Sequence, residues 1–292
     1  SQCGAMTSAA PPSFLIGLIG AGIQASRSPA MHEREGEAHG FRYWYRLIDV
    51  DVLGLGPKAL PQLLTAAEWM GFSGLNITHP FKQAVIPHLT ELSEDARALG
   101  AVNTVLLRDG KRIGHNTDWS GFAASFQRGL PDAEVDRVTL LGAGGAGAAV
   151  AHAVLTLGAL HLDIFDVDEG RASSLAENLG HRFGEERVAA VTDLRGSIEQ
   201  AQGLIHASPT GMKAHPGLPL PADWLRPALW VAEIVYFPLE TELLRAARRI
   251  GCRTLDGGGM AVFQAVDAFR LFTGAAPDPQ RMLEHFAAMA AA

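Results

Sequence analysis

Cysteine is scarce in this 292-residue chain, which contains only Cys3 and Cys252. Two thiols so far apart provide neither a disulfide framework nor a Cys-x-x-Cys metal site, so a reducing cytoplasmic setting and no metal are expected. Positive charge is scarce as well, because 24 Lys and Arg stand against 31 Asp and Glu, for a net charge of −7. Nucleic-acid surfaces need clustered basic residues, so this balance excludes a nucleic-acid partner and favours a small molecule.

Membrane and export signals are also lacking. Residues 1–12 have no apolar signal-peptide core; we expect them to be disordered or partly a tag, and they are left out of the fold prediction. Residues 138–162 carry no Asp, Glu, Lys or Arg, a run longer than the roughly 20 residues that span a bilayer. Five glycines interrupt that run, so it predicts a buried strand, turn and helix, and no membrane partner is expected.

The first part of the chain alternates short apolar strands with helices, as in a sheet joined by crossover connections. Ser28-Pro29 is read as the N-cap and first residue of a helix ending near Gly40, and Asp109-Gly110 as a hairpin turn. The expected strands cover residues 14–19, 43–50, 74–78, 102–107 and 112–114, and a second helix covers 61–70.

A glycine-rich turn opens a second series of strands and helices. Gly142, Gly144 and Gly147 satisfy G-x-G-x-x-G directly after a strand and at the start of a helix, with Gly145 and Ala146 between them. In such a turn the first glycine permits the bend, the second lets backbone approach a pyrophosphate, and the third lets helix and strand pack closely. The pattern predicts a dinucleotide-binding, Rossmann-type lobe.

The end of the next strand indicates which dinucleotide is bound. Asp166 follows Ile164-Phe165, 24 positions after Gly142, close to the ~20 expected for a carboxylate that binds a ribose 2′-hydroxyl. A carboxylate there would repel the 2′-phosphate of NADP, so NAD is favoured. Arg171 leaves NADP open, because a guanidinium can stack on adenine or pair with a phosphate.

The expected fold is therefore two-domain α/β. Its N-terminal substrate domain is a mixed, mainly parallel αβ sandwich, and the other domain is Rossmann-type. Later strands are expected at residues 203–207 and 230–235, and closing helices at 260–273 and 279–291 that pack back on the first lobe. The predicted boundaries are residues 1–118 with 260–292 for the substrate domain and 119–259 for the nucleotide domain.

Polar residues gather where the strands of the first sheet end, which is where α/β proteins bind ligands. Hydroxyl and amide groups with one Lys and one Asp suit a polyol that carries no phosphate. The residues are Ser26, Ser28, Asn76, Thr78, Lys82, Asn103, Asn116, Thr117 and Asp118.

The sequence resembles the shikimate dehydrogenase family over nearly its whole length. The motifs that carry the resemblance, in order, are SRSPAMH, LNITHPFKQAV, LGAVNTV, GHNTDWSGF, LGAGGAG, ASPTGM and DGGGMAVFQAVDAF. FDVDEGR, WVAEIVYFPLETELLRAARRIGC and DAFRLFTG look closest to the NAD-dependent quinate/shikimate branch. The chain departs from the common pattern at His206-Ala207-Ser208 and at Gly257 to Gly259.

The resemblance implies an enzyme that oxidises shikimate or quinate at a ring hydroxyl to the 3-dehydro ketone, with Lys82 and Asp118 as the catalytic pair. Removal of hydride from a carbinol requires loss of its O–H proton, and a Lys amine beside a carboxylate can relay that proton. The implied substrate residues are Ser26, Ser28, Thr78, Asn103, Tyr236 and Gln264. The implied residues around the nicotinamide half of the cofactor are Ser208, Thr210, Met212, Val235 and Gly257.

Two other interpretations remain. One is a biosynthetic NADP-dependent shikimate dehydrogenase in which Arg171 holds the 2′-phosphate. The other is a sensor that binds a dinucleotide or a shikimate-like acid without catalysis, because fold alone does not fix activity. His79, His115 and His206 lie near these motifs and are read as hydrogen-bonded scaffold residues. A homodimer is compatible with the sequence, which does not show surface patches.

Overall fold

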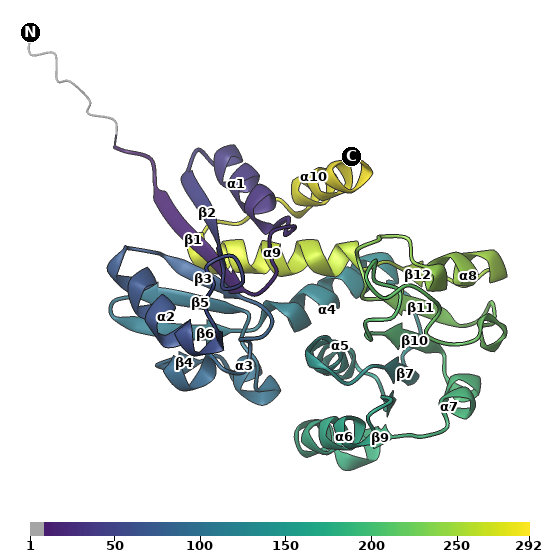
Figure 1. The fold of residues 1–292 in the computed structure, drawn as a ribbon. Helices are drawn as coiled ribbons and strands as arrows, with labels where there is room; N and C mark the ends of the chain where they lie inside the picture. The colour runs from purple at the N-terminus through teal and green to yellow at the C-terminus, as the bar shows by residue number, and fades with distance from the viewer. Residues whose placement is uncertain (1–8) are drawn as a thin grey trace, which may run out of the picture.

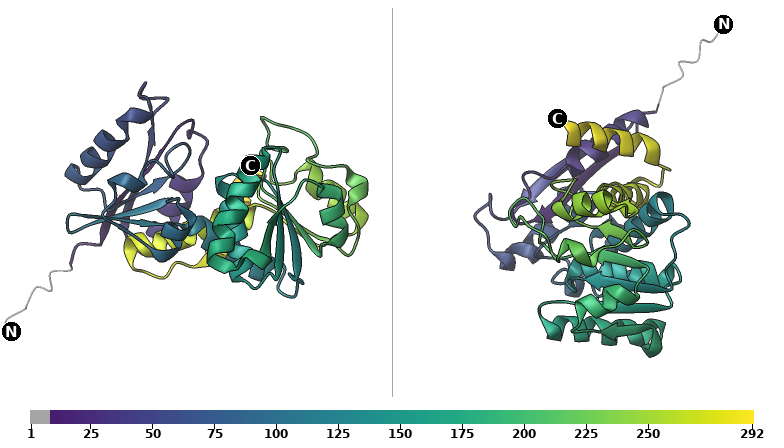
Figure 2. Two further views of the ribbon diagram at one scale, coloured as in Figure 1. Left: turned by 90° about the horizontal axis from the view of Figure 1, so that it is seen from below. Right: turned by 90° about the vertical axis from the view of Figure 1, so that its right-hand side faces the viewer.

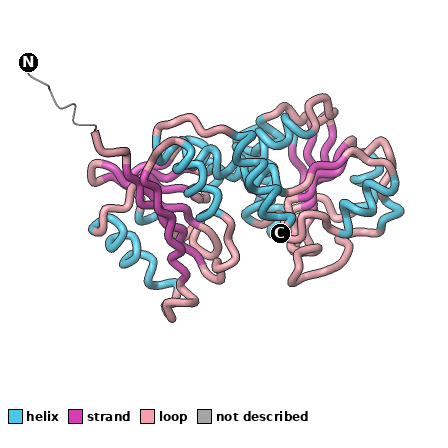
Figure 3. Tube along the Cα trace, turned by 90° about the horizontal axis from the view of Figure 1, so that it is seen from above, coloured by secondary structure: helices cyan, strands magenta, loops and turns pink. Residues whose placement is uncertain are grey.

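The computed structural model describes residues 9–292, so the prediction for residues 1–8 lies outside the described part of the chain. Two six-stranded sheets form two lobes with helices between them (Figure 2, Figure 3). The first sheet is mixed and the second wholly parallel, which confirms the predicted two-domain α/β class. None of the helices within residues 9–292 combines the length and apolarity needed to cross a membrane.

The first sheet has the strand order β2-β1-β3-β5-β6-β4. Its strands β1 and β3 run parallel, and β5 and β6 form the antiparallel hairpin predicted at Asp109-Gly110, where φ is 54° and 73°. The strands are β1 (Ser13–Gly20), β2 (Arg42–Asp49), β3 (Gly74–Ile77), β4 (Glu91–Leu92), β5 (Thr104–Arg108) and β6 (Lys111–His115). The helices are α1 (Ser28–Ala38), α2 (Leu60–Trp69) and α3 (Glu94–Leu99).

One prediction in this lobe is wrong. Ser28 does not cap α1, because Arg27 occupies the N-cap position and Ser28 is already helical. The backbone N–H of Ser28 instead donates to the hydroxyl of Ser26, 3.2 Å away. Pro29 does lie in the first turn, as its missing N–H and fixed φ favour.

The second sheet has the strand order β12-β11-β10-β7-β8-β9. The strand order reverses between β7 and β10. The carboxyl ends of these two strands therefore form the switch point at which doubly wound sheets bind ligands. The strands are β7 (Arg137–Leu141), β8 (His161–Phe165), β9 (Val188–Ala190), β10 (Gly203–His206), β11 (Trp230–Glu233) and β12 (Thr254–Leu255). The helices are α5 (Gly145–Thr156), α6 (Glu169–Phe183), α7 (Leu194–Gln200) and α8 (Glu242–Ile250).

Residues 138–162 form the strand, turn and helix that the glycines predict. In the second lobe, four short elements, β9, α7, α8 and β12, have no counterpart in the sequence prediction, and in the first lobe β4 and α3 have none. Each of the three unpredicted strands, β4, β9 and β12, is only two or three residues long, too short for an alternating pattern to be visible.

Two helices join the lobes. Helix α4 (Thr117–Gly129) packs along α9 (Gly258–Thr273), and Figure 1 shows α9 running back from the second lobe to the first. The approach is close: a Cβ on Gly121 would lie 2.6 Å from the Gln264 nitrogen, and one on Gly259 would lie 2.1 Å from the Ser125 hydroxyl. Phe269 of α9 sits in the aromatic core under the first sheet, and α10 (Pro279–Ala291) packs against α9 and α1.

Candidate active site

A lysine and an aspartate meet at the carboxyl edge of the first sheet. Lys82 follows the end of β3, and Asp118 lies in the first turn of α4, 36 residues further on. The Lys82 Nζ donates to Asp118 Oδ2 over 2.7 Å. The Lys82 side chain is about one-third exposed (32%) and the Asp118 side chain is 16% exposed, so the ion pair has contact with solvent on one side.

The Asp118 carboxylate is fixed by its place in the helix. Asn116 caps α4 by accepting from the backbone N–H groups of Asp118 and Trp119. The partial positive charge at a helix N-terminus favours an anion there. Asn103 donates to Asp118 Oδ1 over 3.2 Å and to the Thr117 hydroxyl over 2.8 Å, so both carboxylate oxygens of Asp118 have a donor.

A buried chain of polar side chains runs from this pair back through the sheet. Tyr45 donates to Asn76, whose amide donates to Thr104, and the Thr104 hydroxyl donates to Asn103 Oδ1. Each of these four side chains is at most 6% exposed. Buried polar networks of this kind hold their members in one arrangement because every group has a partner. Sequence reasoning did not assign a role to Tyr45 or Thr104, since both lie within strands and read as ordinary core residues.

A second residue that the sequence prediction missed is Asp49, at the end of β2. Its carboxylate accepts from the backbone N–H groups of Gly22 and Ile23 and from the Gln24 amide. Desolvation raises the pKa of Asp49, but these hydrogen bonds outweigh it and lower the pKa below its usual value. Asp49 therefore fixes the loop that leads to Ser26.

The other predicted substrate residues lie around this edge. Ser26 and Ser28 are partly buried in the loop after β1 and the first turn of α1, and Thr78 follows β3. Gln264 lies on α9, where its main-chain carbonyl accepts from the Thr117 hydroxyl and its side-chain amide donates to the Ala261 carbonyl. Tyr236 comes from the other lobe, after β11, and is 52% exposed.

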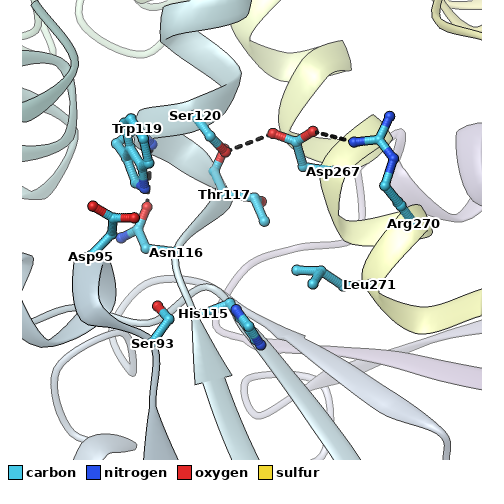
Figure 4. A pocket seen from close by; sticks show the side chains of 10 residues that line it. All are labelled: Ser93, Asp95, His115, Asn116, Thr117, Trp119, Ser120, Asp267, Arg270 and Leu271. Carbon is cyan, nitrogen blue, oxygen red and sulfur yellow. Dashed lines mark hydrogen bonds and ion pairs between the residues drawn. The ribbon is translucent and has the colours of Figure 1, made fainter. Parts of the chain in front are cut away.

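A pocket of about 240 Å³ lies beside the first turn of α4 and is lined by neither Lys82 nor Asp118 (Figure 4). Ser120 donates to Asp267 over 2.6 Å and Arg270 pairs with the same carboxylate, so these side chains satisfy one another. His115 also lines it, and burial together with the nearby Arg108 lowers the pKa of this histidine. The role predicted for His115, a hydrogen-bonded scaffold residue, stays a prediction.

The glycine turn after β7 has the geometry expected of a phosphate-binding loop. Gly142 has φ of 115°, and a Cβ on Gly147 would lie 2.1 Å from the Gly142 carbonyl oxygen, so both positions require glycine. At Gly144 and Gly145 a Cβ would meet no atom of residues 9–292 within 4 Å. No side chain in the described chain caps the start of α5. Its first amides are therefore available to an anion, and these residues fit a dinucleotide pyrophosphate.

Asp166 lies beside this turn, at the end of β8. Its carboxylate accepts from the backbone N–H of Ala143 and of Asp168, each over 2.8 Å, and is 8% exposed. Arg171 is largely exposed, and its guanidinium lies 3.6 Å from Asp166 and 3.8 Å from Asp168. Asp166 thus connects the end of β8 to the glycine turn. Arg171 lies on the solvent side of Asp166.

The residues predicted around the nicotinamide come from the loops after β10 and β11 and, for Gly257, from the turn between β12 and α9. The two loops meet where the Lys213 N–H donates to the Phe237 carbonyl. Gly257 permits a close approach within the protein, because a Cβ there would lie 2.4 Å from the Ile234 carbonyl and 2.7 Å from the Val235 carbonyl. Ser208 and Thr210 are partly buried, Met212 is exposed, and Val235 is buried.

Together, these features define a two-domain dehydrogenase. One lobe has an open glycine turn at the switch point of a parallel sheet, and the other has a lysine–aspartate ion pair at the carboxyl edge of its sheet. A family model described as "Shikimate dehydrogenase substrate binding domain" matches residues 18–105. The chain belongs to the shikimate dehydrogenase family, as similarity along almost its entire length shows.

Three relatives illustrate the similarity. A "Shikimate dehydrogenase (NADP(+))" of Streptomyces avermitilis is 62% identical over 280 residues, covering 95% of this chain and 96% of the relative. A "Quinate/shikimate dehydrogenase (NAD(+))" of Corynebacterium glutamicum is 52% identical over 282 residues, covering 94% and 98%. The structure of "Quinate dehydrogenase from Corynebacterium glutamicum in complex with NAD" has a TM-score of 0.90 at 50% identity and covers 95% and 99%.

Proposed function

We propose that this chain reversibly oxidises shikimate or quinate, or both, at the ring hydroxyl on C3, giving 3-dehydroshikimate or 3-dehydroquinate. The observation that carries the proposal is the Lys82–Asp118 pair, 2.7 Å apart at the carboxyl edge of the substrate-lobe sheet. The helix that holds Asp118 leads directly to β7 and the glycine turn, so the two sites are joined through α4.

The pair handles the proton of the reaction. Oxidation of a carbinol removes a hydride from carbon and a proton from oxygen, and a bound nicotinamide ring supplies the hydride acceptor. Lys82 Nζ first releases a proton to solvent and then, as the free amine, takes the hydroxyl proton, while Asp118 holds the amine in position and stabilises the ammonium that forms again. Because Lys82 is partly exposed, the proton passes from Nζ to solvent. In the reverse direction Lys82 donates the proton to the ketone oxygen.

The remaining polar groups of the edge bind the acid. Ser26, in the loop that Asp49 orders, and Ser28, in the first turn of α1, hold the carboxylate. Thr78, Asn103, Tyr236 and Gln264 contact ring hydroxyls. Asn103 is already fixed by Thr117 and Asp118, so this part of the site is organised before substrate arrives.

We propose NAD as the cofactor. The support is Asp166, whose buried carboxylate beside the glycine turn would repel a 2′-phosphate and accept from a ribose 2′-hydroxyl. Gly142, Gly144, Gly145, Ala146 and Gly147 hold the pyrophosphate; Ser208, Thr210, Met212, Val235 and Gly257 surround the nicotinamide half. The second candidate is NADP, favoured by the exposed guanidinium of Arg171 and by the cofactor named for the Streptomyces relative.

The experiment is a rate assay of the purified chain with each acid and each cofactor. We expect turnover with shikimate or quinate and a higher kcat/KM with NAD than with NADP. A higher kcat/KM with NADP would overturn the NAD proposal, and no turnover of either acid would overturn the dehydrogenase proposal.

The variant Asp166→Asn tests whether Asp166 determines the preference for NAD over NADP. We expect weaker NAD binding and a smaller preference for NAD, because the charge opposed to the 2′-phosphate is removed. Arg171→Ala is the matched variant on the NADP side: it should leave NAD kinetics nearly unchanged. If Arg171→Ala abolishes NADP use while Asp166→Asn leaves NADP kinetics as they were, the NADP assignment is correct.

The domain boundaries are part of the same proposal. Residues 1–118 and 260–292 would form the substrate domain, and 119–259 the nucleotide domain. The packing of Phe269 and Phe272 under the first sheet supports the return of the closing helices to that domain. The cytoplasmic location and the homodimer stay predictions.

A further inference from the structure

Three side chains that take no part in the proposed proton transfer, Glu233, His206 and Ser208, form a hydrogen-bonded chain at the carboxyl ends of β10 and β11. This chain is called the relay below. His206, at the end of β10, lies opposite Glu233 of the neighbouring strand β11. His206 Nδ1 is 2.6 Å from Glu233 Oε1, and its Nε2 is 2.5 Å from the Ser208 hydroxyl oxygen. His206 is fully buried and Glu233 is 1% exposed, whereas Ser208 is only partly buried.

The direction of the hydrogen bonds is set at the far end of this relay. Thr241 caps α8, so its hydroxyl oxygen accepts from the Leu244 N–H and its hydrogen is directed to Glu233 Oε2, 2.9 Å away. The Val235 N–H donates to Glu233 Oε1 over 3.2 Å. A carboxylate surrounded in this way accepts only, and the nitrogen of His206 that faces it must therefore carry hydrogen.

The tautomer of His206 then decides what Ser208 can do. When the imidazole is neutral, hydrogen on Nδ1 leaves a lone pair on Nε2, which accepts a hydrogen bond. In that form the Ser208 hydroxyl points its hydrogen at His206 Nε2. What Ser208 presents to its exposed side is an oxygen with lone pairs only.

Ser208 lies where a nicotinamide would be placed by the proposed function, on which this inference rests. It follows β10 at the switch point, and its backbone nitrogen would be 2.8 Å from a Cβ on Gly142. A nicotinamide carboxamide carries both an NH₂ donor and a carbonyl acceptor. An oxygen held as an acceptor can pair only with the NH₂ group.

We propose that Ser208, held as an acceptor by His206 and Glu233, receives a hydrogen bond from the carboxamide NH₂ of the nicotinamide ring. Ser208 is thus a specificity-determining residue for the cofactor ring, and His206 and Glu233 are positioning residues. With the opposite tautomer of His206, Ser208 would donate to the carboxamide oxygen instead. A nicotinamide analogue that keeps the carbonyl oxygen and lacks the NH₂ distinguishes the two arrangements. It loses the hydrogen bond to Ser208 in the first arrangement and keeps it in the second.

The experiment is direct calorimetric titration of the full chain with NAD and with its 3-acetylpyridine analogue, in which a methyl group replaces the NH₂. The wild-type chain should bind NAD more tightly. Ser208→Ala should reduce that preference by roughly threefold to tenfold, the value of one net hydrogen bond. Ser208→Thr keeps the hydroxyl and should keep the preference.

His206→Asn tests the relay itself. An Asn amide at this position reaches Glu233 and is too short to reach Ser208, so it releases the Ser208 hydroxyl. We expect a reduced preference for NAD over the analogue, smaller than the change in Ser208→Ala. Thermal unfolding of each variant shows whether the fold persists, and Ser208→Ala, at a partly exposed position, provides the test if His206→Asn does not fold.

Equal preference in the wild type and in Ser208→Ala would overturn the inference. A chain that binds neither nucleotide would overturn both this inference and the dehydrogenase proposal. A chain with the Ser208-dependent preference that turns over no hydroxy acid would support this inference and overturn the dehydrogenase proposal alone.

Discussion

The two strand-end sites of this protein are built from different materials. In the substrate lobe the site is made of side chains: Lys82 and Asn103 both donate hydrogen bonds to Asp118, and the network continues from Asn103 through buried groups to Tyr45. In the nucleotide lobe the site is made of backbone: Gly144 and Gly145 leave open space next to the first residues of α5. A lobe that performs proton transfer needs placed side chains, whereas a lobe that binds a pyrophosphate needs amides and room.

This difference predicts how each lobe responds to substitution. Loss of one functional group in the substrate lobe should remove turnover while leaving the nucleotide site intact, because the network does not extend into the glycine turn. Addition of one methyl group in the nucleotide lobe should disturb binding, because the site is defined by the absence of side chains.

Asp118→Asn should have the largest effect. The amide keeps the size of the side chain but removes the charge that holds Lys82 Nζ, and we expect turnover to fall by ~10²- to 10⁴-fold. Steady-state kcat with saturating acid and NAD is the measurement. Asp109→Asn, at the hairpin position with φ of 54° that Asn tolerates, is the matched control and should keep full activity. Equal activity of the two variants would contradict the side-chain account of the substrate lobe.

Gly147→Ala should have the next largest effect. Its Cβ would lie 2.1 Å from a backbone oxygen, so the turn must shift, with a cost of about 1–3 kcal/mol in the free energy of unfolding and weaker NAD binding. Gly145→Ala has open space and should keep the stability while weakening NAD binding. Denaturant unfolding and NAD titration of both variants check this. A Gly145→Ala chain as unstable as Gly147→Ala would contradict it.

Glu35→Gln should have the smallest effect on turnover and should leave NAD binding unchanged. Glu35 is buried on α1, and burial raises its pKa, but hydrogen bonds from Arg281, the Asp278 N–H and His39 outweigh burial and lower the pKa. A lowered pKa in the folded state gives stability that is present above the ordinary pKa and lost as pH falls through the lowered value. We expect a loss of about 2 kcal/mol near neutral pH.

Denaturant unfolding across pH separates this interaction from a general defect. The difference between wild type and Glu35→Gln should shrink as the solution becomes acidic, and NAD affinity should not change. Glu37→Gln, at an exposed position of the same helix, is the control and should match the wild type at every pH. A difference that stays constant with pH would contradict the assigned role of the Glu35 carboxylate.

The sequence predicted the fold well where local signals are strong. The glycine turn, the Asp109-Gly110 hairpin and the helix beginning near Met260 all carry turn or capping residues beside clear apolar patterns. It failed at Ser28, where the cap position lies one residue earlier, and at β9 and β12, where pairing with a neighbouring strand creates an element too short to have its own pattern.

The site could be predicted only residue by residue. Lys82 and Asp118 were named from motifs, and the structure places them in contact. The residues that hold them, Tyr45 and Thr104, and Asp49 beneath the Ser26 loop, could not be found, because their partners are distant in sequence and their roles arise from contacts across the sheet. Likewise, a lone histidine such as His206 shows its partners only once β10 and β11 are paired.

We propose that side chains of the substrate lobe perform the proton transfer while the nucleotide lobe binds NAD independently. The most direct test measures turnover and NAD affinity together in Lys82→Ala, with Lys58→Ala, an exposed lysine of the same lobe, as control. We expect a ~10²- to 10⁴-fold loss of turnover in Lys82→Ala, with NAD affinity little changed. Turnover equal to that of the control, or a loss of NAD affinity as large as the loss of turnover, would contradict it.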